Sequence, residues 1–500
     1  MNEKFEDHKY FTTSLIFLFL AQIMSLLIRM GSRIIIARFS SPDIYGLYSV
    51  IWNEMTLVST IALIGLGQQL TIDLPRENNK EKKRSALTAV VYALIVGLIL
   101  CCISIVLLII NIESTYKYSL LIASVFIVFL FVQSIFIGMK DFLGYFIQSV
   151  SQNLFFLITI VIVRQFLTIE IMMYILLSSI VFSIIVSAIY LLIKTKISIR
   201  SIFSIKIKLF VFSSKRANLF LVDVINSIIF YFLLKIPQII LGNSFAGFIN
   251  IAYSLMVFLI IPPQMIALAL GPKLSLDFHE SKWDKLQNSY KMALSILYIF
   301  QGIVIIIFSY FGDVFIELLY GHEYLVGSRI IFYGFLFAAI IDSFNYQYAI
   351  FIRNTDNEKL FALGKIISLI AFIVPEITLL FVLSDYVMVA VPVAYLISTF
   401  SLLVFYFFYN IKLNEKYEKK DLRIFLMWLL FIFSNYILAL ITVHYLHNKL
   451  YVLAVALVNV LIFIFYLMIS KTINIKKIIH DLKEMFSLIR NKNENNQITE

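Results

Sequence analysis

Cysteine and charge are both scarce in this sequence, and each shortage excludes a class of protein. Cys101 and Cys102 are the only cysteines and are adjacent in the chain, so they can build neither a disulfide framework nor a metal-binding spacing. Charged residues make up 14% of the 500 residues and hydrophobic residues 61%, whereas a soluble domain is about 45–50% apolar. The composition therefore predicts a protein embedded in a membrane.

Motifs of catalysis are absent as well. The sequence has no GxxxxGK[ST] loop for nucleotide phosphates and no HExxH, GxSxG or CxxC motif. Its six histidines lie outside the apolar segments or at their margins. We therefore predict that the protein is not an enzyme and holds no metal or organic cofactor.

Long apolar runs follow one another along the whole chain. A membrane-spanning helix needs about 20 mostly apolar residues. Fourteen runs reach this length: 11–36, 45–72, 86–110, 118–139, 144–163, 171–193, 217–241, 245–270, 291–311, 330–352, 360–383, 386–410, 424–445 and 450–470. The segments between them are too short for a soluble domain. The sequence predicts an all-α integral membrane protein with fourteen transmembrane helices.

The distribution of basic residues predicts the orientation of these helices. With a cytoplasmic N-terminus, 32 of the 41 Lys and Arg residues fall in segments on the cytoplasmic side. Only Arg38, Lys117, Arg164 and Lys449 fall in segments on the other side. Because cytoplasmic loops carry the excess of bases, we expect both termini in the cytoplasm. This asymmetry also explains the net charge of +11, and no basic groove indicates a nucleic-acid partner.

A short repeat indicates that the core is duplicated. GQQLTIDL at 67–74 and GPKLSLDF at 271–278 lie 204 positions apart. Each ends an even-numbered apolar run, which favours two pseudo-symmetric six-helix bundles of the same orientation, a plan found in transporters. The expected parts are an N-terminal bundle at 1–193, a cytoplasmic basic linker at 194–216, a C-terminal bundle at 217–410, two additional helices at 424–470 and a cytoplasmic tail at 471–500.

Ionisable side chains within the apolar runs are the strongest functional signal. A charge at membrane depth costs at least ~2.5–3.5 kcal/mol and usually lines a water-filled path or a binding site. Arg29 and Arg33 lie four residues apart and therefore share one helix face. Guanidinium groups suit phosphate oxygens, because their planar donors can bind two at once. The residues predicted to line a cavity for an anionic headgroup are Arg29, Arg33, Lys235, Lys365, Gln148 and Gln152.

Each of these bases also has a purely structural interpretation. Arg33, Lys365 and, one helical turn deeper, Arg29 can extend their charged ends to the lipid headgroups. Lys235 can instead form an internal ion pair with Glu54 or Glu376. The glutamines can meet sugar hydroxyls or simply a neighbouring helix.

Four acidic residues lie within the apolar runs as well: Glu54, Asp223, Asp342 and Glu376. A buried carboxylate can carry a proton or pair with a cation, so these residues are candidates for coupling to H⁺ or Na⁺. The alternative is that each balances the charge of a buried base.

Helix breakers mark candidate hinges. Glycine and proline interrupt the predicted helices at Gly65, Gly67, Pro237, Pro262, Pro263 and Pro375. Proline removes a backbone hydrogen bond and kinks a helix. Such kinks either permit movement or are static.

Four stretches, in order and spacing, are similar to one family of membrane proteins. They are IIIARFSSPDIYGLYSV (34–50), IALIGLGQQLTIDLPR (61–76), IILGNSFAGFINIAYSLM (239–256) and EYLVGSRIIFYGFLFAAII (323–341). The chain thereby resembles the O-antigen-type polysaccharide flippases of the multidrug/oligosaccharidyl-lipid/polysaccharide exporter superfamily, whose fold is shared by MATE and MurJ proteins. One departure is that members often carry an Asp before the LG of the seventh helix, where this sequence has Pro237.

The resemblance implies a flippase of the plasma membrane that carries oligosaccharide units on polyprenyl diphosphate from the inner to the outer leaflet. It implies alternating access and use in surface polysaccharide assembly. Expected partners are the glycolipid, membrane lipids and polysaccharide polymerase or assembly proteins, and a monomer is expected. The alternatives are a multidrug or cation exporter of the same superfamily and a flippase for a lipid-linked cell-wall precursor. A membrane glycan polymerase is disfavoured, because no outer segment is long enough to carry catalytic groups.

Overall fold

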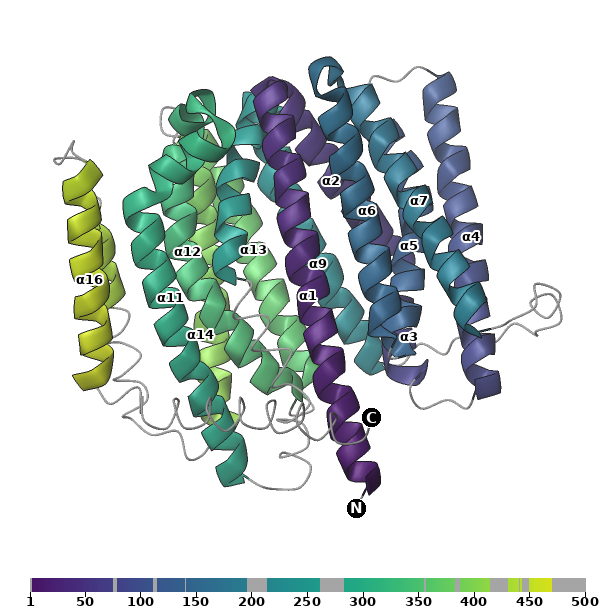
Figure 1. The fold of residues 1–500 in the computed structure, drawn as a ribbon. Coiled ribbons are helices and arrows are strands. Elements are labelled where there is room, and N and C mark those ends of the chain that lie inside the picture. The colour runs from purple at the N-terminus through teal and green to yellow at the C-terminus, as the bar shows by residue number, and fades with distance from the viewer. Residues whose placement is uncertain are drawn as a thin grey trace, which may run out of the picture. The chain divides into compact units, whose positions relative to one another are not determined.

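The protein is all-helical in every part of the chain that the computed structural model describes (Figure 1). The described residues are 2–74, 79–110, 115–139, 141–195, 214–260, 283–354, 357–382, 387–413, 430–439, 441–442 and 449–469. No β-strand occurs among them. This agrees with the predicted all-α class.

The helices follow the apolar runs of the sequence closely. Their bounds are α1 Asn2–Phe39, α2 Pro42–Leu63, α3 Leu66–Asp73, α4 Asn79–Ile109, α5 Tyr116–Gly138, α6 Phe142–Val163, η2 Arg164–Phe166, α7 Ile169–Thr195, α9 Ser214–Leu241, α11 Trp283–Tyr320, α12 His322–Asn354, α13 Glu358–Val382, α14 Val387–Leu413 and α16 Lys449–Ile469. Two further helical segments cover Asn243–Ile260 and Leu430–Ala439.

Ten of the described helices are long and apolar enough to cross a membrane. Large apolar side chains are exposed along many of them, and Leu98 and Ile109 on α4 are 66% and 77% exposed. Since a lipid bilayer is the solvent that tolerates such a surface, the chain is a multi-pass membrane protein. The number of fourteen transmembrane helices remains a prediction, because this survey covers the described residues alone.

One predicted run is divided in the structure. The apolar run 45–72 becomes α2 and α3, which are separated by Ile64 and Gly65. Both residues adopt left-handed backbone angles, with φ of 46° and 69°. Glycine takes this conformation at no steric cost, so Gly65 permits the chain to leave α2 and start α3 at once.

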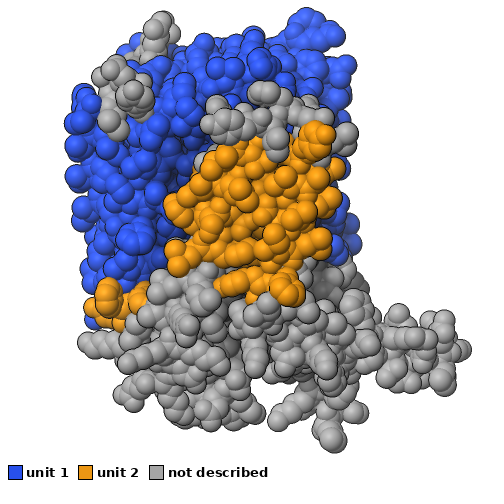
Figure 2. Space-filling view, turned by 90° about the vertical axis from the view of Figure 1, so that its left-hand side faces the viewer, with its two compact units in different colours: residues 1–258, 314–406 blue, residues 259–313, 407–500 orange. Residues whose placement is uncertain are grey.

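The chain forms two compact units, coloured in Figure 2. Unit 1 contains residues Met1–Phe258 and Val314–Tyr406, and unit 2 contains Leu259–Asp313 and Phe407–Glu500. The predicted bundle 1–193 therefore falls within unit 1, whereas the predicted bundle 217–410 contributes to both units. The predicted domain boundaries themselves remain a prediction. Residues 196–213 of the predicted linker 194–216 and the whole predicted tail 471–500 lie outside the described residues.

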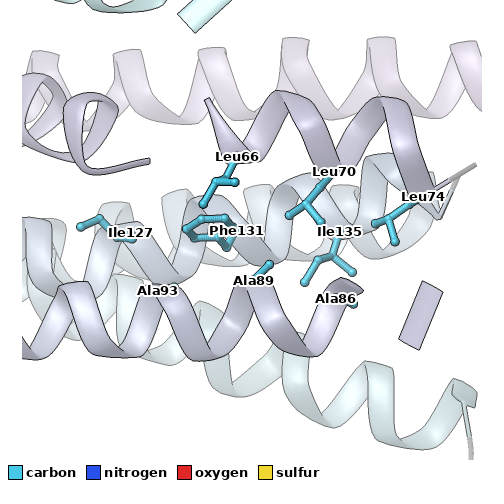
Figure 3. Close-up of a cluster of buried hydrophobic side chains, with 9 residues drawn as sticks. All are labelled: Leu66, Leu70, Leu74, Ala86, Ala89, Ala93, Ile127, Phe131 and Ile135. Carbon is cyan, nitrogen blue, oxygen red and sulfur yellow. The ribbon is translucent and has the colours of Figure 1, made fainter. Parts of the chain in front are cut away.

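Within unit 1, α3, α4 and α5 pack around a cluster of buried side chains (Figure 3). The cluster consists of Leu66, Leu70, Leu74, Ala86, Ala89, Ala93, Ile127, Phe131 and Ile135. Members recur three or four residues apart on each helix, so they line one face of it. The alanines of α4 leave room for the larger side chains of α3 and α5. This packing fixes the short helix α3, which borders a cavity described below.

Candidate functional site

A cavity of about 250 Å³ lies in unit 1 between α1, α2, α9 and the Asn243–Ile260 helix. Its lining consists of Leu26, Arg29, Met30, Arg33, Trp52, Asn53, Phe230, Leu233, Leu234, Asn250, Tyr253, Ser254 and Val257. The two arginines that the sequence placed on one helix face therefore meet in one cavity. We call this space the arginine cavity.

Local helix geometry directs both arginines into this space. Met30 and Ser32 are buried on the packed side of α1, and the Ser32 hydroxyl donates to the Ile28 carbonyl at 3.1 Å. Arg29 remains exposed, with its Cζ atom 6.0 Å from the centre of the Trp52 ring. Such a contact with an aromatic face stabilises a cation without neutralising it.

Neither guanidinium forms an ion pair with a carboxylate among the described residues. Ion pairs among the described residues include Lys194–Asp141, Lys235–Glu54 and His322–Glu317. Two positive groups four residues apart on a helix repel each other. An anion bound between them removes that repulsion, so the arginine cavity is suited to a negatively charged ligand.

The rest of the arginine cavity is uncharged and mostly apolar, and its polar side chains come from distant parts of the chain. The Asn250 side chain donates to the Tyr45 hydroxyl at 3.0 Å and to Ser49 Oγ at 2.7 Å. Ser254 Oγ lies 3.0 Å from the Tyr320 hydroxyl. Sequence reasoning did not select Trp52, Asn250 or Ser254 as site residues. The one available signal was that Tyr253-Ser254 repeats Tyr48-Ser49 at an offset of 205.

Lys235 and Glu54 form an ion pair, with Lys235 Nζ 2.9 Å from Glu54 Oε1. Glu54 is 1% exposed and also accepts hydrogen bonds from Thr115 at 2.8 Å and Ser119 at 2.6 Å. Lys235 Nζ lies 5.3 Å from the centre of the Tyr116 ring. The structure thus contains the internal pair that the sequence allowed as an alternative, and this pair joins α2 to α9. A role of Lys235 in ligand binding remains a prediction.

A second cavity, of about 210 Å³, lies further along α2 and α9 within unit 1. Its lining consists of Thr60, Leu63, Gly65, Gly67, Thr71, Leu130, Gln133, Ser134, Phe220 and Asp223. We call it the α3 cavity, because α3 forms one of its walls. Asp223, a predicted coupling residue, is the one ionisable group among these lining residues.

The remaining predicted residues lie away from the two cavities. Gln148 is buried between α5 and α6, and its side chain donates to the Phe129 carbonyl at 2.9 Å. Gln152 is buried as well, with 4% of its surface exposed. Neither residue is part of the lining of these cavities, so a role for them in ligand binding has no support in this geometry.

Asp342 and Lys365 interact electrostatically with each other across α12 and α13. Asp342 also accepts weak hydrogen bonds, from Asn345 and from the Tyr395 hydroxyl, each at 3.4 Å. For Asp342 this is the charge-balance alternative that the sequence left open, whereas Lys365 was expected either to bind the ligand or to extend its charge to the lipid headgroups.

Glu376 on α13 is fully buried, and neither of its carboxylate oxygens has a hydrogen-bond partner among the described residues. A buried carboxylate without a partner is costly in its charged form. Among the four predicted coupling acids, Glu376 is therefore the one whose surroundings most favour a bound proton or cation.

The candidate hinges occupy different environments. Gly65 directly precedes α3 and adopts the left-handed conformation, and a Cβ atom on Gly67 would lie 2.9 Å from Ser134 Oγ. Pro237 and Pro375 lie inside α9 and α13, which continue past them. Pro262 and Pro263 lie outside the described residues. Movement at any of these positions remains a prediction.

The two predicted halves meet closely at the α1–α2 turn. A Cβ atom on Gly46 would lie 1.8 Å from the Asn243 carbonyl oxygen, so α2 packs backbone to backbone on the start of the Asn243–Ile260 helix. Asp43 accepts hydrogen bonds from the Ser244 amide at 3.1 Å and from its hydroxyl at 2.6 Å. Arg38 donates to the last carbonyls of α11, those of Leu318 and Leu319. Within unit 1, these contacts join the α1–α2 turn to the Asn243–Ile260 helix and the end of α1 to the end of α11.

Comparison with known proteins identifies a family and a shared fold. A family model described as "Polysaccharide biosynthesis protein" matches residues 11–276, just over half of the chain. No curated protein matches the sequence.

Solved structures of transporters share the fold at low sequence identity. The structure described as lipid II flippase MurJ in an inward closed conformation has a TM-score of 0.61 and 17% identity over 90% of this chain and 99% of that one. An inward-facing multidrug resistance MATE family transporter of the MOP superfamily has a TM-score of 0.60 and 13% identity over 81% and 100%. A MOP superfamily transporter from Pyrococcus furiosus, described as having a binding pocket of reverse polarity, has a TM-score of 0.56 and 15% identity over 81% and 95%. At this identity the likeness shows the fold alone.

Proposed function

This chain belongs to the polysaccharide biosynthesis protein family, and from this premise we propose that it is a flippase for polyprenyl-diphosphate-linked oligosaccharides. The cargo moves from the inner to the outer leaflet of the plasma membrane for surface polysaccharide assembly. Its headgroup passes through the protein while the polyprenyl tail stays in the bilayer. The family and the shared transporter fold support transport of a lipid-linked glycan, and the site supports the chemistry of its headgroup.

The observation that carries the proposal is the pair of arginines, Arg29 and Arg33, which line one cavity without a carboxylate partner among the described residues. A diphosphate offers several anionic oxygens, and each planar guanidinium can bind two of them. The low-dielectric surroundings strengthen this attraction compared with water. A cavity for organic cations would instead need unpaired acids, and none lines this one.

Transport by alternating access is consistent with the contacts at the α1–α2 turn. With both termini in the cytoplasm, as the basic residues indicate, that turn faces outward. The contacts of Gly46, Asp43 and Arg38 then close the outer end of unit 1. The cargo enters from the inner side, and separation of these contacts releases it on the outer side.

We assign coupling to the buried acids, with H⁺ or Na⁺ as the coupling ion. Glu376 is the first candidate, because its oxygens lack hydrogen-bond partners in the described part of the chain. Asp223 follows because it faces a cavity. Glu54 and Asp342 are engaged with Lys235 and Lys365, so replacement of either should alter stability more than ion dependence.

The test is leaflet transfer in vesicles that contain only this protein. The cargo is a short neutral glycan on polyprenyl diphosphate, and a small organic cation serves as the competing substrate. We expect transfer of the glycolipid alone, and Arg29→Ala should abolish it while membrane insertion stays intact. Arg164→Ala removes an exposed arginine at the end of α6 and serves as the matched control with normal transfer.

Two outcomes overturn the proposal. Movement of the cation alone places the protein among the drug exporters. Full activity of Arg29→Ala removes the arginine cavity from the mechanism. If only a lipid-linked peptidoglycan precursor is moved, the protein is a flippase with a different cargo.

A further inference from the structure

We infer that the α3 cavity is a binding site for an uncharged sugar residue of the cargo, separate from the diphosphate site. This inference rests on the proposed function and adds to it the part of the substrate that the arginine cavity does not recognise. It is carried by the position of the α3 cavity and by the chemistry of its lining.

The two cavities lie along the same faces of the same two helices. On α2, Asn53 lines the arginine cavity and Thr60 lines the α3 cavity. On α9, Phe230 lines the first and Asp223 the second. Each pair is separated by seven residues, which is two helical turns or about 10 Å along the axis. Seven residues return to the same face of a helix, so one elongated headgroup can reach both spaces.

The linings of the two cavities differ in charge and in hydrogen-bonding character. The α3 cavity offers the hydroxyls of Thr60, Thr71 and Ser134, the Gln133 amide and the Asp223 carboxylate, and no basic side chain is among its lining residues. Hydroxyls and amides both donate and accept, and a carboxylate accepts from two or more donors. A ligand that carries several hydroxyl groups satisfies such a set, whereas a phosphate does not.

The apolar part of the lining fits the same ligand. Leu63, Leu130 and Phe220 supply apolar surface beside the polar groups. A sugar ring presents C–H faces as well as hydroxyls, and ligand sites of this kind are mostly apolar with a few well-placed polar groups. Asp223 adds a carboxylate to a lining that contains no basic side chain, and this disfavours an acidic sugar because like charges repel each other.

The polar groups are held in place by contacts with their own surroundings. Gln133 Nε2 donates to Ser149 Oγ at 3.1 Å. Thr60 Oγ1 donates to the Thr56 carbonyl at 2.8 Å and accepts from Ser227 at 3.2 Å. Side chains that are already oriented lose less entropy when they bind a ligand. The site is therefore largely formed before the sugar arrives.

Gly67 sets the size of the cavity. It lies in α3 with ordinary helical geometry, and a Cβ atom there would stand 2.9 Å from Ser134 Oγ. A larger side chain would occupy cavity volume without adding charge. This position offers a steric test that is independent of hydrogen bonding.

The experiment compares two cargoes in vesicles that contain the full chain. One is polyprenyl diphosphate with a neutral hexose, and the other is polyprenyl diphosphate without a sugar. We expect Gln133→Ala to lower the transfer ratio of the first to the second by about tenfold, the effect of one lost hydrogen-bonded contact to a buried ligand. Gly67→Val should lower the same ratio because its side chain occupies cavity volume. Arg29→Ala should lower transfer of both cargoes. The control is Thr378→Ala, which changes an exposed threonine bonded to its own helix and should leave the ratio unchanged.

A third cargo, with a hexuronic acid in place of the hexose, tests the sign of the charge. Asp223→Asn should raise its transfer relative to the neutral cargo. Three results overturn the sugar site and leave the proposed function intact. The first is that Gln133→Ala lowers transfer of the hexose cargo and of the sugar-free cargo equally, and the second is that Gln133→Ala and Gly67→Val both leave transfer unchanged. The third such result is that Asp223→Asn changes only the ion dependence of transfer. If the unmodified protein moves neither lipid, the proposed function fails and the sugar site fails with it.

Discussion

At the scale of single residues, the guanidinium groups of Arg29 and Arg33 are expected to act through geometry as well as charge. Lysine keeps the positive charge but concentrates it at one point and loses the planar fork that matches phosphate oxygens. Arg29→Lys should therefore retain measurable glycolipid transfer at a rate about tenfold lower, whereas Arg29→Ala should lose it. The measurement is initial leaflet transfer in vesicles, with Arg164→Lys as the control. Equal transfer rates for the unmodified protein and Arg29→Lys would show that the site recognises the cargo through positive charge alone.

The ion pair between Glu54 and Lys235 predicts a stability effect. Both side chains are largely buried, and removal of one partner from a buried pair leaves an uncompensated charge that typically costs about 3–5 kcal/mol. We expect Glu54→Gln to lower the unfolding temperature of the protein in detergent. The double variant Glu54→Gln/Lys235→Met should recover most of this loss, because neither charge is then present.

The same double-variant cycle separates structure from transport. Independent effects of the two changes would contradict the pair, since contacting residues give non-additive free energies. A transport defect that persists in the stable double variant would assign Lys235 to the ligand site after all. The cycle thus decides between the two interpretations that the sequence left open.

Residues near each other in the chain were the easier ones to place from sequence. Arg29 and Arg33 could be predicted to share a face because helical periodicity alone determines it. Asn250 and Tyr253 could not be added to them, because their position depends on how the Asn243–Ile260 helix packs against α1 and α2. Gln148 carried the same polar signal as a cavity residue, yet it bonds to the backbone of α5. A polar residue in an apolar run therefore indicates a partner, and packing decides which one.

At the scale of elements, the proposed mechanism requires the contact between α2 and the Asn243–Ile260 helix to open for release of the cargo. Asp43 and Ser244 are in hydrogen-bond contact across it, so the double variant Asp43→Cys/Ser244→Cys in a Cys101→Ser/Cys102→Ser background should form a disulfide under oxidation. We expect this bond to stop glycolipid transfer and a reductant to restore it.

The control for this cross-link lies within the first predicted half. Ser151 Oγ on α6 and Ser183 Oγ on α7 are 3.2 Å apart, so a cysteine pair there can also be oxidised. Both helices belong to the predicted N-terminal bundle, 1–193, and are expected to move together. A bond between them should therefore leave transfer intact. Unchanged transfer with Asp43 and Ser244 joined would exclude opening at the α1–α2 turn.

The residues at which helices begin and end are predicted less well from sequence patterns than the helices themselves. The run 45–72 is continuously apolar, so the pattern predicted one helix, whereas the backbone reverses to left-handed angles at Ile64 and Gly65. Gly65 was recognised as a helix breaker, but a glycine in an apolar run does not reveal whether the helix bends or ends. The packing of α3 against α4 and α5 supplies the missing information.

At the scale of the whole molecule, the orientation in the membrane connects the closed end of unit 1 with the direction of transport. The positive-inside rule places the η2 turn between α6 and α7 on the outer side and the start of α13 on the cytoplasmic side. Gln165 and Lys359 are exposed residues at these two places. In the background without native cysteines, Gln165→Cys should react with a membrane-impermeant thiol reagent in intact cells, and Lys359→Cys only after permeabilisation.

The labelling result decides what the closed end means for transport. The expected pattern places the contacts of Gly46, Asp43 and Arg38 on the outer side, which is the arrangement required for a glycolipid built inside the cell to enter first. The opposite pattern would place those contacts at the cytoplasmic face, so that the protein would be closed to its own substrate in this state. Labelling of both positions from the same side would mean that an even number of crossings separates the η2 turn from the start of α13, whereas the apolar runs predict five. Labelling at these two positions therefore tests the orientation of the protein, the side on which unit 1 makes these contacts and the direction of cargo movement.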